Sequence, residues 1–141
     1  MAKQIWKPGN MLYPLPAVLV SCMRPGDRPN ALTVAWAATV CSEPPMLSVS
    51  VRKERYSHDI IMETGEFVVN LTTKQMVHAT DYCGVRSGRD VDKFKECGFH
   101  EEPSQVVSVP GIKESPVNIE CKVAEAKVLG SHTMFIANVV G

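Results

Sequence analysis

The stretch that decides the fold is residues 30–57, NALTVAWAATVCSEPPMLSVSVRKERYS. Its first part, residues 30–40, alternates between two kinds of side chain, and successive strand side chains point to opposite faces of a sheet. We therefore expect one strand here, with a core face and a face of small side chains on which a flat molecule could lie. The core face comprises Leu32, Val34, Trp36, Ala38 and Val40, and the small face comprises Ala31, Thr33, Ala35, Ala37 and Thr39.

A second strand is predicted over residues 46–52, after a turn at Glu43-Pro44-Pro45. Its apolar positions alternate with polar ones, so one face is expected to enter the core and the other to carry two hydroxyls and a guanidinium. The expected core face comprises Leu47, Val49 and Val51, and the opposite face comprises Met46, Ser48, Ser50 and Arg52.

The end of this stretch predicts an anion site. Ser57 has the character of a helix N-cap ahead of an expected helix at residues 57–63. The N-terminus of a helix favours anions because its N–H groups lack partners and carry partial positive charge. Arg52 adds a planar set of donors that suits phosphate oxygens. These residues indicate a phosphate site beside a strand shaped for a flat ring; the alternative is a polar barrel rim with a surface arginine.

The rest of the chain places short helices among antiparallel strands. Residues 1–15 are expected to form an arm, with Trp6 and Tyr13 free to pack against the body or a second subunit. A capping-box spacing from Thr72 to Gln75 predicts the start of one helix. Strands are expected at residues 17–23, 30–40, 46–52, 66–71, 117–129 and 133–140, and helices at 57–63, at 72–82 and from Asp92 to Gly98. This order favours an α+β fold, mainly β, over a doubly wound parallel sheet.

Composition argues against several classes of function. The 141 residues carry 15 basic and 15 acidic side chains, so the chain lacks the charge that attracts nucleic acid or an anionic membrane. No apolar run approaches the roughly 20 residues that span a bilayer. Prolines interrupt the apolar segment that follows Lys3 and Lys7, which argues against a secretory signal, and we expect a cytoplasmic protein.

Neither a metal centre nor a disulfide framework is indicated. The five cysteines are widely spaced and contain no C-x-x-C pair. Cys22 and Cys121 fall within strand patterns, where free cysteine usually serves as a small core residue. His58, His78 and His100 share no ligand spacing, so no metal site is expected.

Six segments, taken in order, resemble the flavin reductase-like, FMN-binding split-barrel family, and within it the flavoredoxins. They are Pro29–Val40, Ser42–Pro45, Ser48–Tyr56, Asp81–Phe94, Glu120–Lys122 and Gly130–Ile136, and they cover nearly the whole chain. The resemblance implies a Greek-key antiparallel split β-barrel with short inserted helices, which forms a homodimer and holds FMN near the subunit interface. Family chains usually continue past the strand that ends here at Val140. We therefore expect residues 1–141 to be one flavin reductase-like domain that is either naturally short or lacks the family's C-terminal segment.

The resemblance also implies where FMN binds. Its isoalloxazine ring would lie along residues 30–36, its ribityl phosphate would lie beside the predicted helix start, and the loop with Ser87, Gly88 and Lys93 would close over it. The implied phosphate ligands are Ser50, Arg52, Tyr56 and Ser57. The full cofactor-binding set is Asn30, Ala31, Leu32, Thr33, Ala35, Trp36, Ser50, Val51, Arg52, Tyr56, Ser57, Ser87 and Lys93. Many flavin reductases have Gly-Asp-His where this chain has Gly130-Ser131-His132, so His132 is the candidate for the nicotinamide or flavin edge. No residue is assigned as an acid or base catalyst.

Three functions remain open from the sequence. The favoured one is an NAD(P)H-dependent flavin (FMN) reductase, which passes electrons between NAD(P)H and flavin. The second is a flavoredoxin-type FMN electron-transfer protein that is reduced by a ferredoxin-like partner. The third is a non-catalytic flavin-binding barrel. In the first two the cofactor carries the chemistry, which accounts for a sequence without a recognisable catalytic triad or carboxylate pair.

Overall fold

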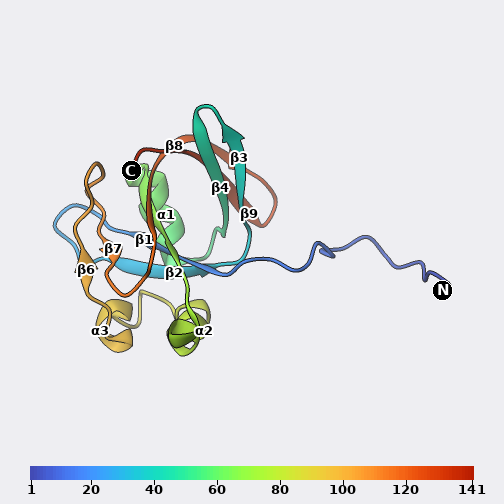
Figure 1. Ribbon diagram of the computed structural model, residues 1–141, viewed down its shortest axis with the longest axis horizontal. Helices are drawn as coiled ribbons and strands as arrows, with labels where there is room; N and C mark the ends of the chain where they lie inside the picture. The colour runs from blue at the N-terminus through green and yellow to red at the C-terminus, as the bar shows by residue number, and fades with distance from the viewer.

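The fold is a seven-stranded antiparallel sheet that curls into an open barrel (Figure 1). The computed structural model describes residues 1–141. In space the strands run β2–β1–β5–β8–β9–β4–β3, so β2 and β3, which are consecutive in the chain, lie at the two ends of the sheet. The strands are β1 Val18–Cys22, β2 Asn30–Val34, β3 Ala37–Ser42, β4 Pro45–Arg52, β5 Glu66–Leu71, β8 Asn118–Val128 and β9 His132–Val139. This arrangement confirms the predicted split barrel, mainly β, with short inserted helices.

The first predicted strand, residues 30–40, is two strands separated by a bend at residues 35–36. β2 pairs with β1 and β3 pairs with β4, so the chain crosses here from one end of the sheet to the other. The bend also shifts the alternation, because core packing reaches Val34 and resumes at Ala37, three residues later. Three of the five residues on the predicted core face are consequently exposed, which corrects that prediction. The exposed members are Trp36, Ala38 and Val40.

The small face of β2 serves mainly to admit a helix. Helix α2, Val77–Val85, packs against this strand. Ala31 is fully buried on that side, and Thr33 Oγ1 donates a hydrogen bond to the carbonyl of Thr80 at 2.5 Å. A Cβ atom on Gly84 would lie 3.4 Å from the Thr33 Cβ, so the helix and strand are in close contact. The expected shelf for a flat ring is therefore covered at Ala31, and it opens only toward the bend.

Helix α1, Tyr56–Thr64, begins one residue earlier than predicted. Its N-cap residue is Arg55, and Ser57 lies in the first turn, where its Oγ accepts a hydrogen bond from Asn30 Nδ2 at 2.7 Å. The predicted N-cap at Ser57 is wrong because this hydroxyl is engaged by the neighbouring strand. Gly65 ends the helix in the left-handed conformation, with φ of 68°.

The predicted start of the second helix is wrong, whereas the predicted start of the third is confirmed. A 3₁₀ turn, Lys74–Met76, leads into α2, and the Thr72 hydroxyl donates to the carbonyl of Ala17 at 2.8 Å, so the predicted capping box is absent. Helix α3, Lys93–Cys97, follows the prediction, since the carboxylate of Asp92 accepts a first-turn backbone N–H at 3.2 Å. None of the helices combines the length and the apolar composition that crossing a bilayer requires.

Residues 99–117 pack against the outer face of β5 and β8. They contain a small second sheet, in which β6, Glu101–Glu102, pairs with β7, Gly111–Ile112. Strand alternation places Glu120 on this outer face, yet its side chain is buried. Its carboxylate accepts three backbone N–H groups from residues 105–107 at 2.7–3.0 Å. A connection without a strong sequence pattern is thus fixed by one buried carboxylate.

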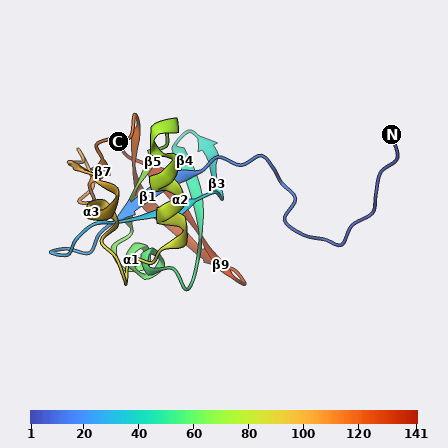
Figure 2. The same ribbon diagram turned by 90° about the horizontal axis from the view of Figure 1, so that it is seen from below.

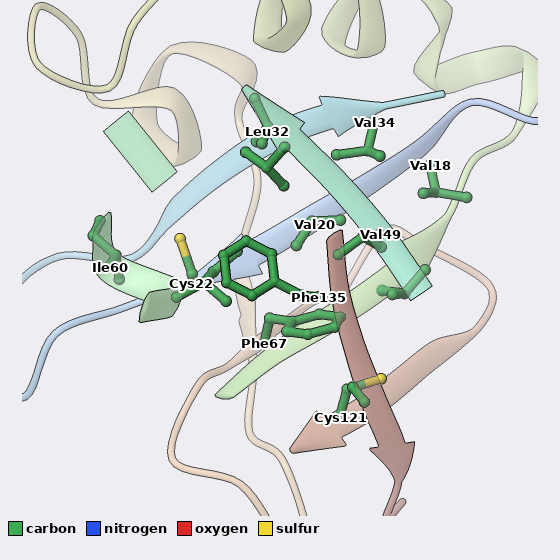
Figure 3. Packing of buried hydrophobic residues seen from close by; sticks show 14 residues of the cluster. Val18, Val20, Cys22, Leu32, Val34, Val49, Ile60, Phe67, Cys121 and Phe135 are labelled. Atoms are coloured by element: carbon green, nitrogen blue, oxygen red, sulfur yellow. The ribbon is translucent and has the colours of Figure 1, made fainter. Parts of the chain in front are cut away.

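The core fills the inside of the barrel (Figure 3). Phe67 of β5 and Phe135 of β9 both belong to this core and are fully buried. Cys22 and Cys121 contribute to the same cluster as free, fully buried thiols, which confirms their predicted role as small core residues.

The N-terminal residues form the predicted arm. Residues 1–15 contain no helix or strand and extend away from the barrel (Figures 1 and 2). The side chains of Trp6 and Tyr13 are both 67% exposed. Aromatic side chains left open to this extent are available for packing against another surface.

Candidate functional site

Two adjoining cavities lie along β2, and both are lined by Leu32 and Arg55. The first, which we call the strand cavity, has a volume of about 260 Å³ and lies between the bend at residues 35–36 and the end of β4. The second, which we call the cationic cavity, has a volume of about 230 Å³ and lies between the start of α1 and residues 86–93. A single elongated ligand could therefore occupy both.

Four cationic side chains line the cationic cavity, against one acidic side chain, Glu54. The cations are Arg55, Arg86, Arg89 and Lys93. The same lining carries the hydroxyl groups of Tyr56, Ser57 and Ser87. Guanidinium groups present forked donors that match phosphate oxygens, and charge-assisted hydrogen bonds of this kind are the strong ones. The donor set thus suits a phosphate group.

The C-terminal end of α2 holds two of these cations in place. Lys93 Nζ donates to the carbonyl of Cys83 at 2.9 Å, and Arg55 Nη2 donates to the carbonyl of Gly84 at 3.0 Å. Lys93 is only 2% exposed, and its burial, aided by the nearby Arg55, lowers its pKa from the ordinary 10.5 to about 8. No carboxylate forms an ion pair with it. An anion in the cavity would supply the missing countercharge.

The loop that carries Arg86 and Arg89 is fastened to the start of α1. Arg89 Nη1 donates to the carbonyl of Glu54 at 3.0 Å, and its guanidinium lies 5.6 Å from the centre of the Tyr56 ring. Gly88 sits closest: a Cβ atom there would lie 2.4 Å from both Asn30 Oδ1 and Tyr56 Cδ1. Only glycine allows the loop this close approach.

The strand cavity is bounded by a stacked aromatic pair. The rings of Trp36 and His132 lie 4.5 Å apart at an interplanar angle of 28°. Partial burial and the charge of Arg52, its cross-strand neighbour, lower the pKa of His132 below its ordinary value and so favour the neutral imidazole. Ser131 Oγ lies 2.7 Å from His132 Nδ1. Small side chains at Ala35 and Ser50 complete a partly apolar recess.

The predicted phosphate ligands divide between the two cavities. Tyr56 and Ser57 line the cationic cavity, whereas Ser50 and the exposed Arg52 line the strand cavity. Of the other predicted cofactor residues, Asn30, Leu32, Ser87 and Lys93 line the cationic cavity, and Thr33, Ala35, Trp36, Val51 and the candidate His132 line the strand cavity. Ala31 lines neither cavity, because it packs beneath the helices.

The sequence reasoning missed the arginines that dominate the cationic cavity, Arg55, Arg86 and Arg89. Arg55 is the last cation of the run Arg52-Lys53-Glu54-Arg55, and strand alternation favoured the first. The other two flank Ser87-Gly88 in the loop that the resemblance did single out. Two arginines around a serine and a glycine were the available signal, since backbone flexibility and positive charge together suit a phosphate.

The chain matches the Flavin reductase like domain family over residues 10–141. Flavoredoxin of Desulfovibrio vulgaris (Miyazaki F) is 34% identical, with a TM-score of 0.91 over 99% of this chain and 75% of that one. Flavoredoxin from Methanosarcina acetivorans is also 34% identical, with a TM-score of 0.90 over 99% and 74%. Flavin reductase (NADH) of Kitasatospora aureofaciens is 30% identical over 129 residues, which are 90% of this chain and 64% of that protein.

These matches agree with the site. The matched region contains both cavities, the bend between β2 and β3, and the loop at residues 86–93. A cationic cavity that adjoins a partly apolar one suits a compound with a phosphate at one end and a ring at the other. The chain is a member of the flavin reductase-like domain family and has the features of a flavin-binding oxidoreductase.

Proposed function

We propose that this chain is an FMN-binding oxidoreductase that passes electrons between NAD(P)H and the flavin. The observation that carries the proposal is the pair of adjoining cavities, one cationic and one flanked by the Trp36–His132 stack. Together their volumes fall within the range of roughly 300–1,000 Å³ that small-molecule sites occupy. FMN, when bound, supplies the redox chemistry that the side chains in the two cavities lack.

The residues present fit the phosphate end of FMN. Hydrogen bonds to carbonyls at the end of α2 position Arg55 and Lys93, and the buried ammonium of Lys93 has only a carbonyl partner. The first turn of α1 adds backbone N–H groups without intrahelical partners. Asn30 steadies that turn through its 2.7 Å hydrogen bond to Ser57. These groups would together hold the phosphate.

The residues of the strand cavity would orient the ring end. The small side chains of Ala35 and Ser50 leave space beside the bend, and the imidazole of His132 limits the cavity on the β9 side. Neither cavity holds a carboxylate pair or a nucleophile paired with a base. The protein's contribution to rate is therefore positioning of the two reactants, which by itself supplies large accelerations.

Anaerobic mixing tests this function. FMN is titrated into the purified chain, and NADH or NADPH is then added while the flavin absorbance is followed. Loss of the oxidised flavin bands with either nucleotide supports the proposal. A protein that binds FMN and is reduced by neither nucleotide contradicts it.

Likeness to two flavoredoxins favours a second candidate, electron transfer from a protein donor to the same bound FMN. The distinguishing arm of the experiment replaces the nicotinamide with a reduced ferredoxin. Reduction by ferredoxin alone would assign the chain to this second function. Binding of FMN without reduction by either kind of donor would leave the third alternative, a non-catalytic flavin-binding barrel.

We also propose that the working form is a homodimer. An apolar groove of about 690 Å³ lies between residues 9–15 of the arm and the outer face of β3 and β4, next to Trp36 of the strand cavity. A second subunit seated there would bury the arm and cover the open side of the flavin site. Light scattering should give twice the 15.5 kDa chain mass; a clean monomer would argue against it.

A further inference from the structure

A pair of thiols joins α2 to α3 next to the cationic cavity. Cys83 of α2 and Cys97 of α3 have their sulfur atoms 3.8 Å apart, in contact, and both are free. The two helices lie side by side below the sheet (Figure 1). Cys83 is fully buried, whereas Cys97 is partly exposed. These are the only two cysteine sulfurs within hydrogen-bonding distance of each other.

The position of this pair connects it to the anion site. The loop between the two cysteines, residues 84–96, carries Arg86, Arg89 and Lys93. The carbonyl of Cys83 itself accepts hydrogen bonds from Lys93 Nζ at 2.9 Å and from Arg55 Nη2 at 3.4 Å. A bond between the two sulfurs would therefore close a ring around three of the four cations and fix the carbonyl on which two of the four depend.

We propose that Cys83 and Cys97 form a redox modification site, at which a hydroperoxide oxidises the two thiols to a disulfide that holds the loop of residues 84–96 in its ligand-binding position. The effect on cofactor affinity rests on the proposed function, whereas the disulfide and the restraint of the loop do not. A disulfide needs its sulfur atoms about 2.05 Å apart, and thiols already in contact reach that distance by small side-chain rotations.

The chemistry balances with hydrogen peroxide as the oxidant. Cys97, the more accessible thiol, loses its proton, and its sulfur attacks one peroxide oxygen; the O–O bond breaks, and hydroxide takes up the proton as water. The Cys83 sulfur then attacks the resulting sulfenic acid, the S–S bond forms, and the S–O bond breaks. The hydroxide released accepts the Cys83 proton, so two thiols and one peroxide give a disulfide and two waters. A dithiol reductant reverses the modification by exchange.

The surroundings of the sulfurs set how readily this happens. Burial raises the pKa of both thiols, to about 12 for Cys83, while the charge of Lys93 opposes the rise. Only the thiolate is nucleophilic, so a raised pKa slows oxidation. We therefore expect slow oxidation at neutral pH, so that the test requires sustained exposure to peroxide.

Peroxide treatment followed by peptide mapping tests the modification. In the wild type and in the control Cys41→Ser, we expect a dithiol-reversible cross-link between the peptides that hold residues 83 and 97, with the loss of two hydrogen atoms. The variant Cys97→Ser should form no such link. Trypsin should cut after Arg86 and Arg89 more slowly in oxidised than in reduced wild type, and equally in both states of Cys97→Ser. Absence of the cross-link, or unchanged cleavage once it has formed, would overturn the proposal.

Flavin affinity provides the second readout. Oxidised wild type should bind FMN about three- to tenfold more tightly than reduced wild type, because the loop is ordered before binding and not during it. Cys97→Ser should show one affinity under both conditions. Equal affinity of the two wild-type forms would refute the coupling between the disulfide and the site. If neither form binds FMN, the proposed function fails, and the modification stands or falls on the cross-link and the cleavage rates.

Discussion

Replacement of Lys93 by methionine should change stability and ligand affinity in opposite directions. Lys93 is 2% exposed, and burial lowers its pKa from 10.5 to about 8. In the unfolded chain the amine keeps its ordinary pKa, so between pH 8 and 10.5 the unfolded state binds more protons than the folded state. Stability must therefore rise with pH across this window. Below it, the folded chain carries the full cost of a buried charge.

The size of that cost follows from the shift. One pKa unit corresponds to about 1.4 kcal/mol, so the change from 10.5 to about 8 corresponds to roughly 3 kcal/mol of destabilisation at neutral pH. The variant Lys93→Met removes the charge and keeps an unbranched side chain. It also loses the hydrogen bond to the carbonyl of Cys83, worth about 1 kcal/mol. Without ligand, the free energy of unfolding of the variant should thus exceed that of the wild type by about 2 kcal/mol near pH 7.

Urea unfolding of both proteins, at about pH 7 and at about pH 10, measures this difference. Subtracting the wild type's free energy of unfolding from the variant's at each pH cancels the titration of the groups that the two proteins share. The advantage of the variant should fall away as pH rises. Its affinity for FMN should nevertheless drop by about ten- to a hundredfold, since a charged hydrogen bond contributes roughly 1.5–3 kcal/mol. A stability difference that stays constant with pH would refute the assignment of a buried, uncompensated ammonium.

Three further perturbations probe the remaining parts of the structure. Arg55→Ala should weaken FMN by about ten- to a hundredfold and leave riboflavin, which has no phosphate, nearly unaffected in equilibrium titrations; Arg52→Ala, outside the cationic cavity, should discriminate between the two ligands far less. Gly88→Ala should lower FMN affinity by about tenfold or more, with a small change in melting temperature, because the added Cβ would meet Asn30 and Tyr56 at 2.4 Å and displace the loop. Glu120→Gln should lower the free energy of unfolding by about 1–3 kcal/mol at neutral pH. Burial raises the pKa of this carboxyl, but its three N–H donors lower the pKa by more, so the folded-state pKa lies below the ordinary value. The stabilisation is therefore lost as pH falls through that lowered pKa, and the unfolding free energies of the two proteins should become equal in acid.

Strand alternation predicted the faces of β4, and Asp92 and Gly98 predicted both ends of α3, because these features depend only on neighbours in the chain. The bend at residues 35–36 was not predicted, because no residue in this segment interrupts the alternation of side chains. It exists because β2 and β3 pair with different strands at opposite ends of the sheet. Strand pairing of this kind depends on the whole barrel, and the alternation pattern of one strand does not predict it.

The choice between Arg52 and Arg55 illustrates the same limit within the site. Both arginines precede α1 and both could be drawn toward an anion, so alternation along β4 offered the only basis for choosing. In the structure, α2 begins more than twenty residues later, and its end presents the carbonyls of Cys83 and Gly84 to Arg55, which therefore lines the cationic cavity. Arg52 has no such partner and remains exposed beside His132.

The bend also explains why the two cavities adjoin. The segment from Asn30 to Trp36 leaves one end of the sheet and reaches the other, lining the cationic cavity first and the strand cavity last. FMN bound as proposed would contact β2 at one end of the open sheet, β4 near the other, and both the start of α1 and the loop at residues 86–93. A ligand that binds only the folded chain stabilises it by about 2.7 kcal/mol at a concentration of 100 times its dissociation constant. Because these contacts span the opening between β2 and β4, that stabilisation would act where the sheet itself provides no hydrogen-bonded ladder.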